Sequence, residues 1–386
     1  MTLRLAEDTS FAHRFGATDP FRIGVEEELF LVDASGHHVR CRTDEVLTDR
    51  PARFTRGRIV GEMCDGVVEL ASPICASADE AIGTLRDLRG DVLARDRGAL
   101  MGVGMHPTAP FGEVVHRAGG HYDAVAEDVR GLLRQSVVCG VHVHVGMPDA
   151  ETAVTAFNGM RKWVPVLQAL GANSPFWHGQ DSGLQSCRTA RFHMMPRTGL
   201  PRAFRDWADY TDTMRELIRV SGIEGPGSLW WDVRPHPSLG TLEVRVFDAQ
   251  SSLDSLRGLT ALVHCLAVHE ASIADDRHPP KELLDEACHH AIRDGLDARL
   301  SLGGPMQHMQ ALAHQALDIA HGYAHELRCV DALSAAEALL AGNGADRQRR
   351  AFAAGGMDAV LEQLVSETVI GPRVACEARG GDRGAA

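Results

Sequence analysis

The sequence predicts an α+β protein built on a mainly antiparallel sheet. Segments that alternate apolar and polar residues come in groups joined by short turns, as in 58–73 and 230–248. Short turns of this kind connect antiparallel neighbours. Segments with helical spacing of apolar residues separate these groups and fill most of the chain after residue 252. We therefore expect helices to cover one face of the sheet and leave the other face open.

The segment 21–32, FRIGVEEELFLV, predicts a strand with two unlike faces. Period-two alternation places Ile23, Val25 and Leu29 on an apolar face, and it places Glu26 and Glu28 on the opposite face. Neighbouring carboxylates on a partly buried strand repel each other unless protons, arginines or metal ions neutralise them. Glu26 and Glu28 are therefore candidate metal ligands, and a solvated acidic strand end is the alternative.

Further elements follow in order. The segment 58–73 predicts two short strands around an Asp65-Gly66 turn, and it carries Glu62 and Glu69. A capping box at 77–80 opens a predicted helix that runs to about residue 100. Residues 122–135 show a weaker helical pattern.

The clearest strand pattern is VVCGVHVHVG at 137–146. Its valines share one face, and His142 and His144 share the other. Asp149 can cap a helix that runs to about residue 170. The loop 173–188 mixes turn formers, tryptophan and charge, including Asp181 and Arg188, and loops of this kind often carry binding groups.

Two more strands are predicted in 230–248, joined by a turn at 235–240. The first contains Arg234, and the second places Glu243 and Arg245 on one face. Helical patterns cover 201–220 and 252–270. We expect residues 1–370 to form a single catalytic domain and 371–386, which are poor in apolar residues, to be disordered.

The open face of the sheet would then gather charged and imidazole side chains from four strands: Glu26, Glu28, Glu62, Glu69, His142, Glu243 and Arg245. Unpaired ions in such a place cost several kcal/mol each, so the set needs counter-charge. Glutamate oxygens suit Mg²⁺ or Mn²⁺ better than structural zinc. Such cations beside arginines are what the chemistry of nucleoside triphosphates requires.

A zinc site is the rival interpretation. The pair His142 and His144 is also typical of metal-dependent hydrolases, in which further ligands complete the shell. His106 and His236, each beside a proline, are candidates for such ligands.

Composition excludes other classes. A net charge of −13 argues against nucleic acids and acidic membranes as partners. The only lysines, Lys162 and Lys281, are not followed by Ser or Thr, which excludes a P-loop. The nine cysteines form no C-x-x-C pair, and no apolar run is long enough to cross a membrane. We expect a cytoplasmic protein with reduced thiols, for which homo-oligomerisation stays open.

A series of motifs in chain order resembles the glutamate–cysteine ligase type 2 family of carboxylate–amine ligases. The motifs are GVEEEL (24–29), VVELASP (67–73), GMHP (104–107), CGVHVHVG (139–146), NSPFWHGQDSG (173–183), WDVRPHPSLGTLEVRVFD (231–248) and GADRQR (344–349). The resemblance implies a glutamine-synthetase-like fold whose curved antiparallel sheet forms the floor of the active site.

The resemblance also implies an activity. ATP would phosphorylate a carboxylate, most simply the γ-carboxylate of L-glutamate, and an amine would displace phosphate from the acyl phosphate to form an amide. L-cysteine or another small amine would be the acceptor. A nucleotide-binding homologue without catalytic activity is a further alternative.

The motifs imply roles for individual residues. Metal ligands would be Glu26, Glu28, Glu62, Glu69, His142 and Glu243. Arg245, Glu243 and Arg234 would act in catalysis, and Arg188, Arg245, His144 and Asp181 would bind substrate or nucleotide. The chain departs from the family pattern at 181–184, where DSGL replaces DTGY, and at 286–296, where a tryptophan is missing. The amine is therefore left open.

Overall fold

The predicted α+β class is confirmed by the computed structural model, which describes residues 11–35, 37–48, 56–95, 98–112, 116–117, 119–133, 137–223, 225–273 and 277–369. A seven-stranded sheet runs in the order β10–β11–β5–β1–β3–β2, and β4 also pairs with β1. Every pairing in this sheet is antiparallel. Its strands are β1 (Ile23–Val32), β2 (Arg58–Gly61), β3 (Val67–Ala71), β4 (Ala99–Met101), β5 (Gly140–Gly146), β10 (Val233–His236) and β11 (Thr241–Asp248).

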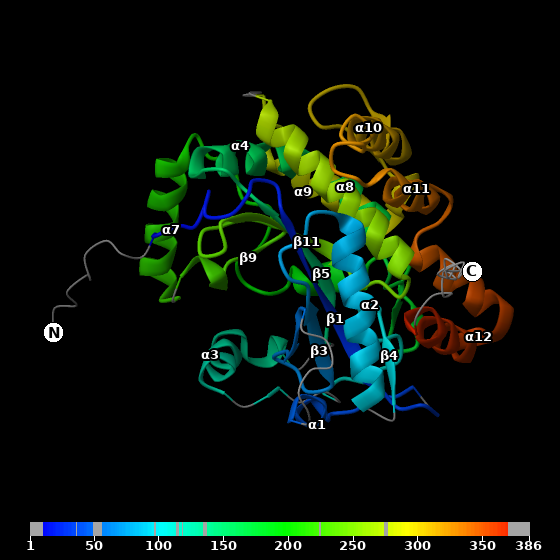
Figure 1. Ribbon diagram of the computed structural model, residues 1–386. Coiled ribbons are helices and arrows are strands. Elements are labelled where there is room, and N and C mark those ends of the chain that lie inside the picture. The colour runs from blue at the N-terminus through cyan, green and yellow to red at the C-terminus, as the bar shows by residue number, and fades with distance from the viewer. Residues whose placement is uncertain are drawn as a thin grey trace, which may run out of the picture.

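Helices cover one face of this sheet. α2 (Ala78–Arg95) packs on β1 and β3, α5 (Val164–Gly171) on β11, and α8 (Leu253–Ser272) on β5. Figure 1 views the molecule from this covered side, with α2 lying across β1. The other helices are α1 (Thr43–Thr48), α3 (Gly120–Val129), α4 (Ala150–Met160), α6 (Cys187–Phe192), α7 (Trp207–Ser221), α9 (Lys281–Asp294), α10 (Met309–His321), α11 (Val330–Ala338) and α12 (Gly344–Thr368).

The covered face is apolar because period-two alternation along the strands turns their apolar side chains toward the helices. Val25 and Leu29 of β1, Val143 of β5 and Val244 of β11 are buried in one core with the inner residues of α2 and α8. Burial of such side chains is the main favourable term in folding. The core therefore fixes which residues the sheet turns toward its open face.

Helix ends follow their capping residues. The side chain of Asp149 accepts the N–H of Thr152 and begins α4, as predicted. The side chain of Ser252 accepts the N–H of Ser255 in the same way at the start of α8, for which only the helical pattern was predicted. The helix expected over 201–220 begins only at Trp207, because Asp206 caps it there. The loop 173–188 contains a short hairpin of β6 (Phe176–Trp177) and β7 (Gln180–Asp181) and leads into α6. The segment 371–386 lies outside the described residues.

A buried ion pair lies on the covered side of β1. The side chains of Glu27 and Arg89 are 0% exposed, and two hydrogen bonds of 2.6 and 2.9 Å join them. The Arg89 guanidinium also donates to the carbonyls of Gln250 and Ser251, both at 2.9 Å. Arg89 therefore ties the central strand to α2 and to the turn before α8.

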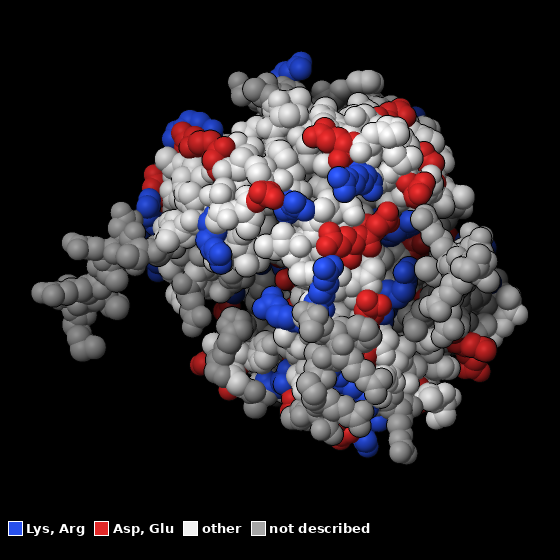
Figure 2. Space-filling model, viewed as in Figure 1, with Lys and Arg blue, Asp and Glu red and all other residues white. Residues whose placement is uncertain are grey.

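The face of the molecule seen in Figure 2 carries mixed charge. Figure 2, in the same view as Figure 1, shows Asp and Glu interspersed with Lys and Arg rather than positive charge gathered in one patch. Within the described part of the chain, no helix combines the length and apolarity that crossing a membrane demands.

Candidate active site

The open face of the sheet brings Glu26 and Glu28 of β1 together with polar residues of the neighbouring strands. Opposite Glu26 lies His142 on β5, and opposite Glu28 lies Glu69 on β3. Directly opposed residues of an antiparallel pair share a face, so all four point to the same side. Glu62, which follows β2, completes a group with Glu28 and Glu69 in which one oxygen of each carboxylate lies within 4.8 Å of the others. We call Glu28, Glu62 and Glu69 the acidic cluster.

The carboxyl groups of the acidic cluster lack sufficient counter-charge within the protein, and two of them retain protons to unusually high pH. Burial and the nearby Glu62 raise the pKa of Glu28 to about 8. Burial and the neighbouring carboxylates, Glu26 first among them, raise the pKa of Glu69 to about 9. The N–H of Gly140 donates to Glu28 at 2.6 Å. Three hard oxygen donors with this unmet charge fit a divalent cation such as Mg²⁺ or Mn²⁺.

A second group lies on the β5, β11 and β10 side of the same face. Opposite Glu243 on β11 lie His144 on β5 and Arg234 on β10. Arg234 Nε donates to Glu243 Oε2 at 2.6 Å, and Arg245 donates to Glu243 Oε1. His144 Nε2 lies 3.5 Å from Glu26 Oε2 and 3.8 Å from Glu243 Oε1. We call this group the paired cluster, comprising Glu26, His142, His144, Arg234, Glu243 and Arg245.

The electrostatics of the paired cluster oppose those of the acidic cluster. Burial alone would raise the pKa of Glu243, but Arg234 and Arg245 hold it well below its usual range. Burial is likewise outweighed at Glu26, whose pKa is lowered by hydrogen bonds with His142 and His144. Burial and the charge of Arg245 lower the pKa of His142 to about 4. The carboxylates of this cluster are therefore ionised and compensated by the protein itself.

Arg245 lies on the open face, where the alternation of β11 predicts it. It follows Glu243 by two residues, so both side chains project to the same side of the sheet. Its N–H donates to the carbonyl of Asp232 at 2.8 Å, on the β10 side of the strand. The pairing of β11 with β5 shifts register between Val244 and Phe247, next to Arg245. The Arg245 guanidinium contacts both Glu243 and His142.

Two guanidinium groups keep unused donors at this face. Arg188 Nη2 donates to the carbonyl of Arg245 at 3.3 Å. The Nε atoms of Arg188 and Arg245 are buried and have no hydrogen-bond partner among the described residues. Arg188 lies so close to Gly140 that a Cβ there would come within 2.2 Å of Nη2. Only glycine leaves room for the guanidinium at that point. Free donors beside a cation site suit an anion such as a polyphosphate.

The histidines do not assemble as the zinc interpretation requires. Among the described residues, the second group able to hold a metal ion is Glu26, His144 and Glu243, without His142. His106 contacts the carbonyl of His37 at 2.8 Å, and His236 lies beside His144 with ring centroids 5.8 Å apart. Both imidazoles of the H-x-H pair instead approach the carboxylate of Glu26. This pattern favours charge balance over a histidine-based zinc shell.

Asp181 is the candidate that lies apart from both clusters in its contacts. It is exposed in β7, and it forms an ion pair with Arg349 of α12 at 2.9 Å. None of the hydrogen bonds between described residues joins it to the open face of the sheet. Its role in substrate binding stays a prediction.

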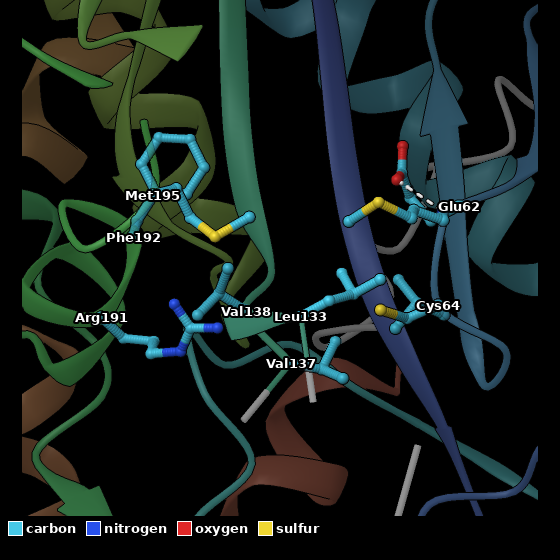
Figure 3. Close-up of a pocket in the computed structure, with 10 residues that line it drawn as sticks. Glu62, Cys64, Leu133, Val137, Val138, Arg191, Phe192 and Met195 are labelled. Carbon is cyan, nitrogen blue, oxygen red and sulfur yellow. Dashed lines mark hydrogen bonds between the residues drawn. The ribbon is translucent and has the colours of Figure 1, made fainter. Parts of the chain in front are cut away.

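An apolar pocket that the sequence did not indicate adjoins the acidic cluster (Figure 3). It lies between the β2–β3 turn, the segment before β5, and α6. Glu62 and Arg191 are its charged residues, and Arg191 has no motif signal beyond its place one turn after Arg188. The remaining lining residues are Met63, Cys64, Val67, Leu133, Val137, Val138, Phe192 and Met195.

Sequence comparison finds relatives along nearly the whole chain. A model of glutamate–cysteine ligase family 2 matches residues 22–367. A glutamate–cysteine ligase of Natronomonas pharaonis is 31% identical over 352 residues, which cover 89% of this chain and 95% of that protein. A glutamate–cysteine ligase of Halobacterium salinarum is 36% identical over 286 residues, or 72% of this chain and 79% of that protein.

Structure comparison finds the same fold at low identity. The crystal structure of a glutamate–cysteine ligase from Francisella tularensis in complex with AMP aligns with a TM-score of 0.67 and 13% identity, over 91% of this chain and 89% of that one. A bifunctional glutathione synthetase from Pasteurella multocida aligns with a TM-score of 0.66 and 14% identity, over 91% of this chain and 52% of that one. These likenesses concern the fold.

Proposed function

The chain belongs to glutamate–cysteine ligase family 2, and from that premise we propose that it joins the γ-carboxylate of L-glutamate to a small amine through an acyl phosphate. Membership makes it an ATP-dependent ligase that forms a carbon–nitrogen bond. The glutamate, the amine and the intermediate are the parts that we propose.

One observation carries the proposal. The acidic cluster, which lacks counter-charge, lies on the same sheet face as the arginines of the paired cluster, and β1 connects them through Glu26 and Glu28. A polyphosphate needs divalent cations on some oxygens and guanidinium groups on others. This face offers both within a few residues of β1. The domain expected over 1–370 would accordingly be built around this strand.

We assign the residues as follows. Glu28, Glu62 and Glu69 would hold one Mg²⁺ or Mn²⁺, and Glu26, with His144 or His142 and Glu243, would hold a second. When bound, these cations would supply positive charge that neutralises the polyphosphate. Arg245 and Arg188 would donate to phosphate oxygens. Arg234 would keep Glu243 ionised and fixed in position.

The reaction has two displacements. A γ-carboxylate oxygen of glutamate attacks the terminal phosphorus of ATP, the bond to the bridging oxygen breaks, and ADP leaves with the electron pair. The amine nitrogen then attacks the acyl carbon, the bond from that carbon to the phosphate oxygen breaks, and phosphate leaves with the pair. The nitrogen releases one proton as the amide forms. Arg245 would stabilise the charge that moves in the first displacement.

Trapping the intermediate tests this proposal directly. The protein would be incubated with Mg·ATP, L-glutamate and hydroxylamine, and hydroxamate and ADP would be measured. We expect equimolar hydroxamate and ADP, both dependent on glutamate. A panel of amines headed by L-cysteine, with ADP release as the readout, would then identify the acceptor.

Two results would overturn the proposal. Tightly bound stoichiometric zinc with hydrolase activity and no hydroxamate would favour the histidine-based alternative. Thermal stabilisation by Mg·ATP without ADP or hydroxamate, for glutamate and other carboxylates alike, would indicate a nucleotide-binding homologue without catalytic activity.

A further inference from the structure

We propose that the apolar pocket beside Glu62 binds the amine acceptor, and that this acceptor is an α-amino acid with an uncharged apolar or thiol side chain whose carboxylate pairs with Arg191. This inference rests on the proposed ligase function. It adds the class of acceptor and the residue that selects it.

Arg191 is a buried cation that no anion of the described residues neutralises. Its side chain belongs to α6 and is only 4% exposed. The guanidinium donates to the carbonyl of Leu132, and its Nε finds no hydrogen-bond partner within the described part of the chain. No carboxylate of the described residues forms an ion pair with it. Burial accordingly lowers the pKa of Arg191, and an uncompensated buried charge of this kind costs several kcal/mol.

Arg188, one turn earlier on α6, provides a contrast. Its side chain is also buried, at 3% exposed. The carboxyl groups of Glu28 and Asp248 lie near it, and its positive charge acts against the rise that burial causes in the pKa of both. Among the residues that the structure describes, Arg191 has no such neighbour. The difference leaves Arg191 available to an anionic group of a ligand, and the guanidinium fork matches a carboxylate in geometry.

The walls of the pocket are apolar around that guanidinium. Three separate segments supply them, and each contributes aliphatic, aromatic or sulfur-containing side chains. Burial raises the pKa of the Cys64 thiol to about 12, so this side chain is neutral and acts as wall rather than nucleophile. A charged or strongly polar ligand side chain would lose its hydration here without a partner.

Glu62 joins the pocket to the reaction site. It lines the pocket and also belongs to the acidic cluster. Figure 3 shows Arg191 extending from α6 toward Val138, while Glu62 lies on the other side of the pocket. An amino acid held by its carboxylate at Arg191 would direct its α-amino group, as the free amine, toward Glu62 and the acyl phosphate. The adenine ring of ATP is the rival occupant, but an uncharged ring leaves Arg191 without its anion.

The first measurement uses the unaltered protein. Rates of ADP release with Mg·ATP and L-glutamate would be compared for L-cysteine, L-valine, L-leucine and L-methionine, for L-aspartate and L-lysine, and for the matching amides of the apolar amino acids. We expect each apolar or thiol amino acid to exceed its amide by at least about 10-fold in kcat/KM, the discrimination that one lost charged contact produces. Preference for an amide or for a charged side chain would overturn the proposal.

Arg191→Met tests the selecting residue, with Arg219→Met on the exposed side of α7 as the matched control. We expect Arg191→Met to raise KM for the amino acid at least about 10-fold and to abolish the preference for the acid over the amide, with unchanged KM for ATP. A raised KM for ATP with an unchanged KM for the amine would assign the pocket to adenine. Unchanged KM values for both would make Arg191 structural.

The hydroxylamine assay separates the two levels of inference. Hydroxamate formation without stimulation of ADP release by any apolar or thiol amino acid would sink the acceptor assignment and leave the ligase function standing. Absence of hydroxamate would remove the ligase function itself. Should Arg191→Met not fold, calorimetric titration of the unaltered protein with L-leucine and with L-leucinamide in Mg·ADP decides, because equal affinities would overturn the role of Arg191.

Discussion

The two clusters on the open face of the sheet balance their charge in opposite ways, although β1 contributes to both. In the paired cluster, Glu243 receives hydrogen bonds from Arg234 and Arg245, and it is ionised without help from outside. In the acidic cluster, Glu28 receives one backbone N–H, and its pKa is raised to about 8. The difference teaches that the carboxylates of the paired cluster are ionised in the metal-free protein, whereas Glu28 and Glu69 of the acidic cluster need positive charge from solution before they ionise.

The largest expected effect concerns the built-in charge. Arg245→Ala should lower the rate of glutamate-dependent ADP release by on the order of 10³-fold, as the loss of an arginine at a transferring phosphoryl group does. Arg245→Lys should recover part of it. The measurement is the steady-state rate at saturating Mg·ATP, and circular dichroism would check the fold. A loss of less than 10-fold would remove Arg245 from phosphoryl transfer.

The next effect separates the clusters by the sign of a stability change. Glu28→Gln should lower turnover at least about 100-fold and should stabilise the metal-free protein, because it removes a repelling carboxylate. Glu243→Gln should destabilise the protein by about 3–5 kcal/mol, because it leaves two buried arginines unpaired. Urea unfolding in a chelator measures both. Changes of the same sign in the two variants would show that the clusters do not differ as described.

A smaller effect is the pH dependence of the metal-free protein. The folded pKa values of Glu28 and Glu69, about 8 and about 9, lie above the ordinary value of 4.5. The folded state therefore binds more protons than the unfolded state between about pH 5 and pH 9, so its stability should fall as pH rises through that range. Each extra proton bound by the folded state lowers the free energy of unfolding by up to about 1.4 kcal/mol for each unit by which the pH rises. Urea unfolding in a chelator should show this slope, and millimolar Mg²⁺ should flatten it.

A slope near zero or an increase of stability with pH in the chelator would contradict the uncompensated character of the acidic cluster. Glu69→Gln offers the matched control. It should remove part of the slope, whereas Asp212→Asn, on the exposed side of α7, should not.

The smallest expected effect is that of Asp181→Asn. Its ion pair with Arg349 is exposed, and such pairs contribute about 0–1 kcal/mol. We expect a change in unfolding free energy below about 1 kcal/mol and unchanged KM values for ATP and glutamate. A clear rise in either KM would instead support the substrate contact that the motif implies.

Alternation along β1 and β5 was enough to predict which residues share the open face, because a period of two is fixed by strand geometry. The partners of Arg188 could not be predicted, since its contact with Gly140 depends on how α6 packs against the sheet. The register shift in β11 after Val244 could not be predicted either, because no pattern in the sequence of that segment marks it. The apolar pocket draws on three segments that are far apart in the chain, so no local motif marks it.

Glu27 is a charged residue on the covered face, where alternation predicts an apolar one. A glutamate at an apolar position breaks the alternation of β1, and its partner Arg89 lies 62 residues away in α2. Sequence periodicity gives no reason to expect a charge there. Only the packing of α2 on β1 makes the pair compatible with the core.

The three consecutive glutamates of β1 also constrain how this strand can change in evolution. Glu26 and Glu28 project to one side and Glu27 to the other, where Arg89 receives it. Insertion or deletion of one residue next to the triplet would shift it by one position. Arg89 would still face a glutamate, but a second carboxylate would be buried beneath α2 without a partner, and only one glutamate of the triplet would stay on the open side. We therefore expect evolution to accept substitutions at the apolar positions of β1 but no change in its length, because a change in length would alter which side of the sheet each glutamate faces.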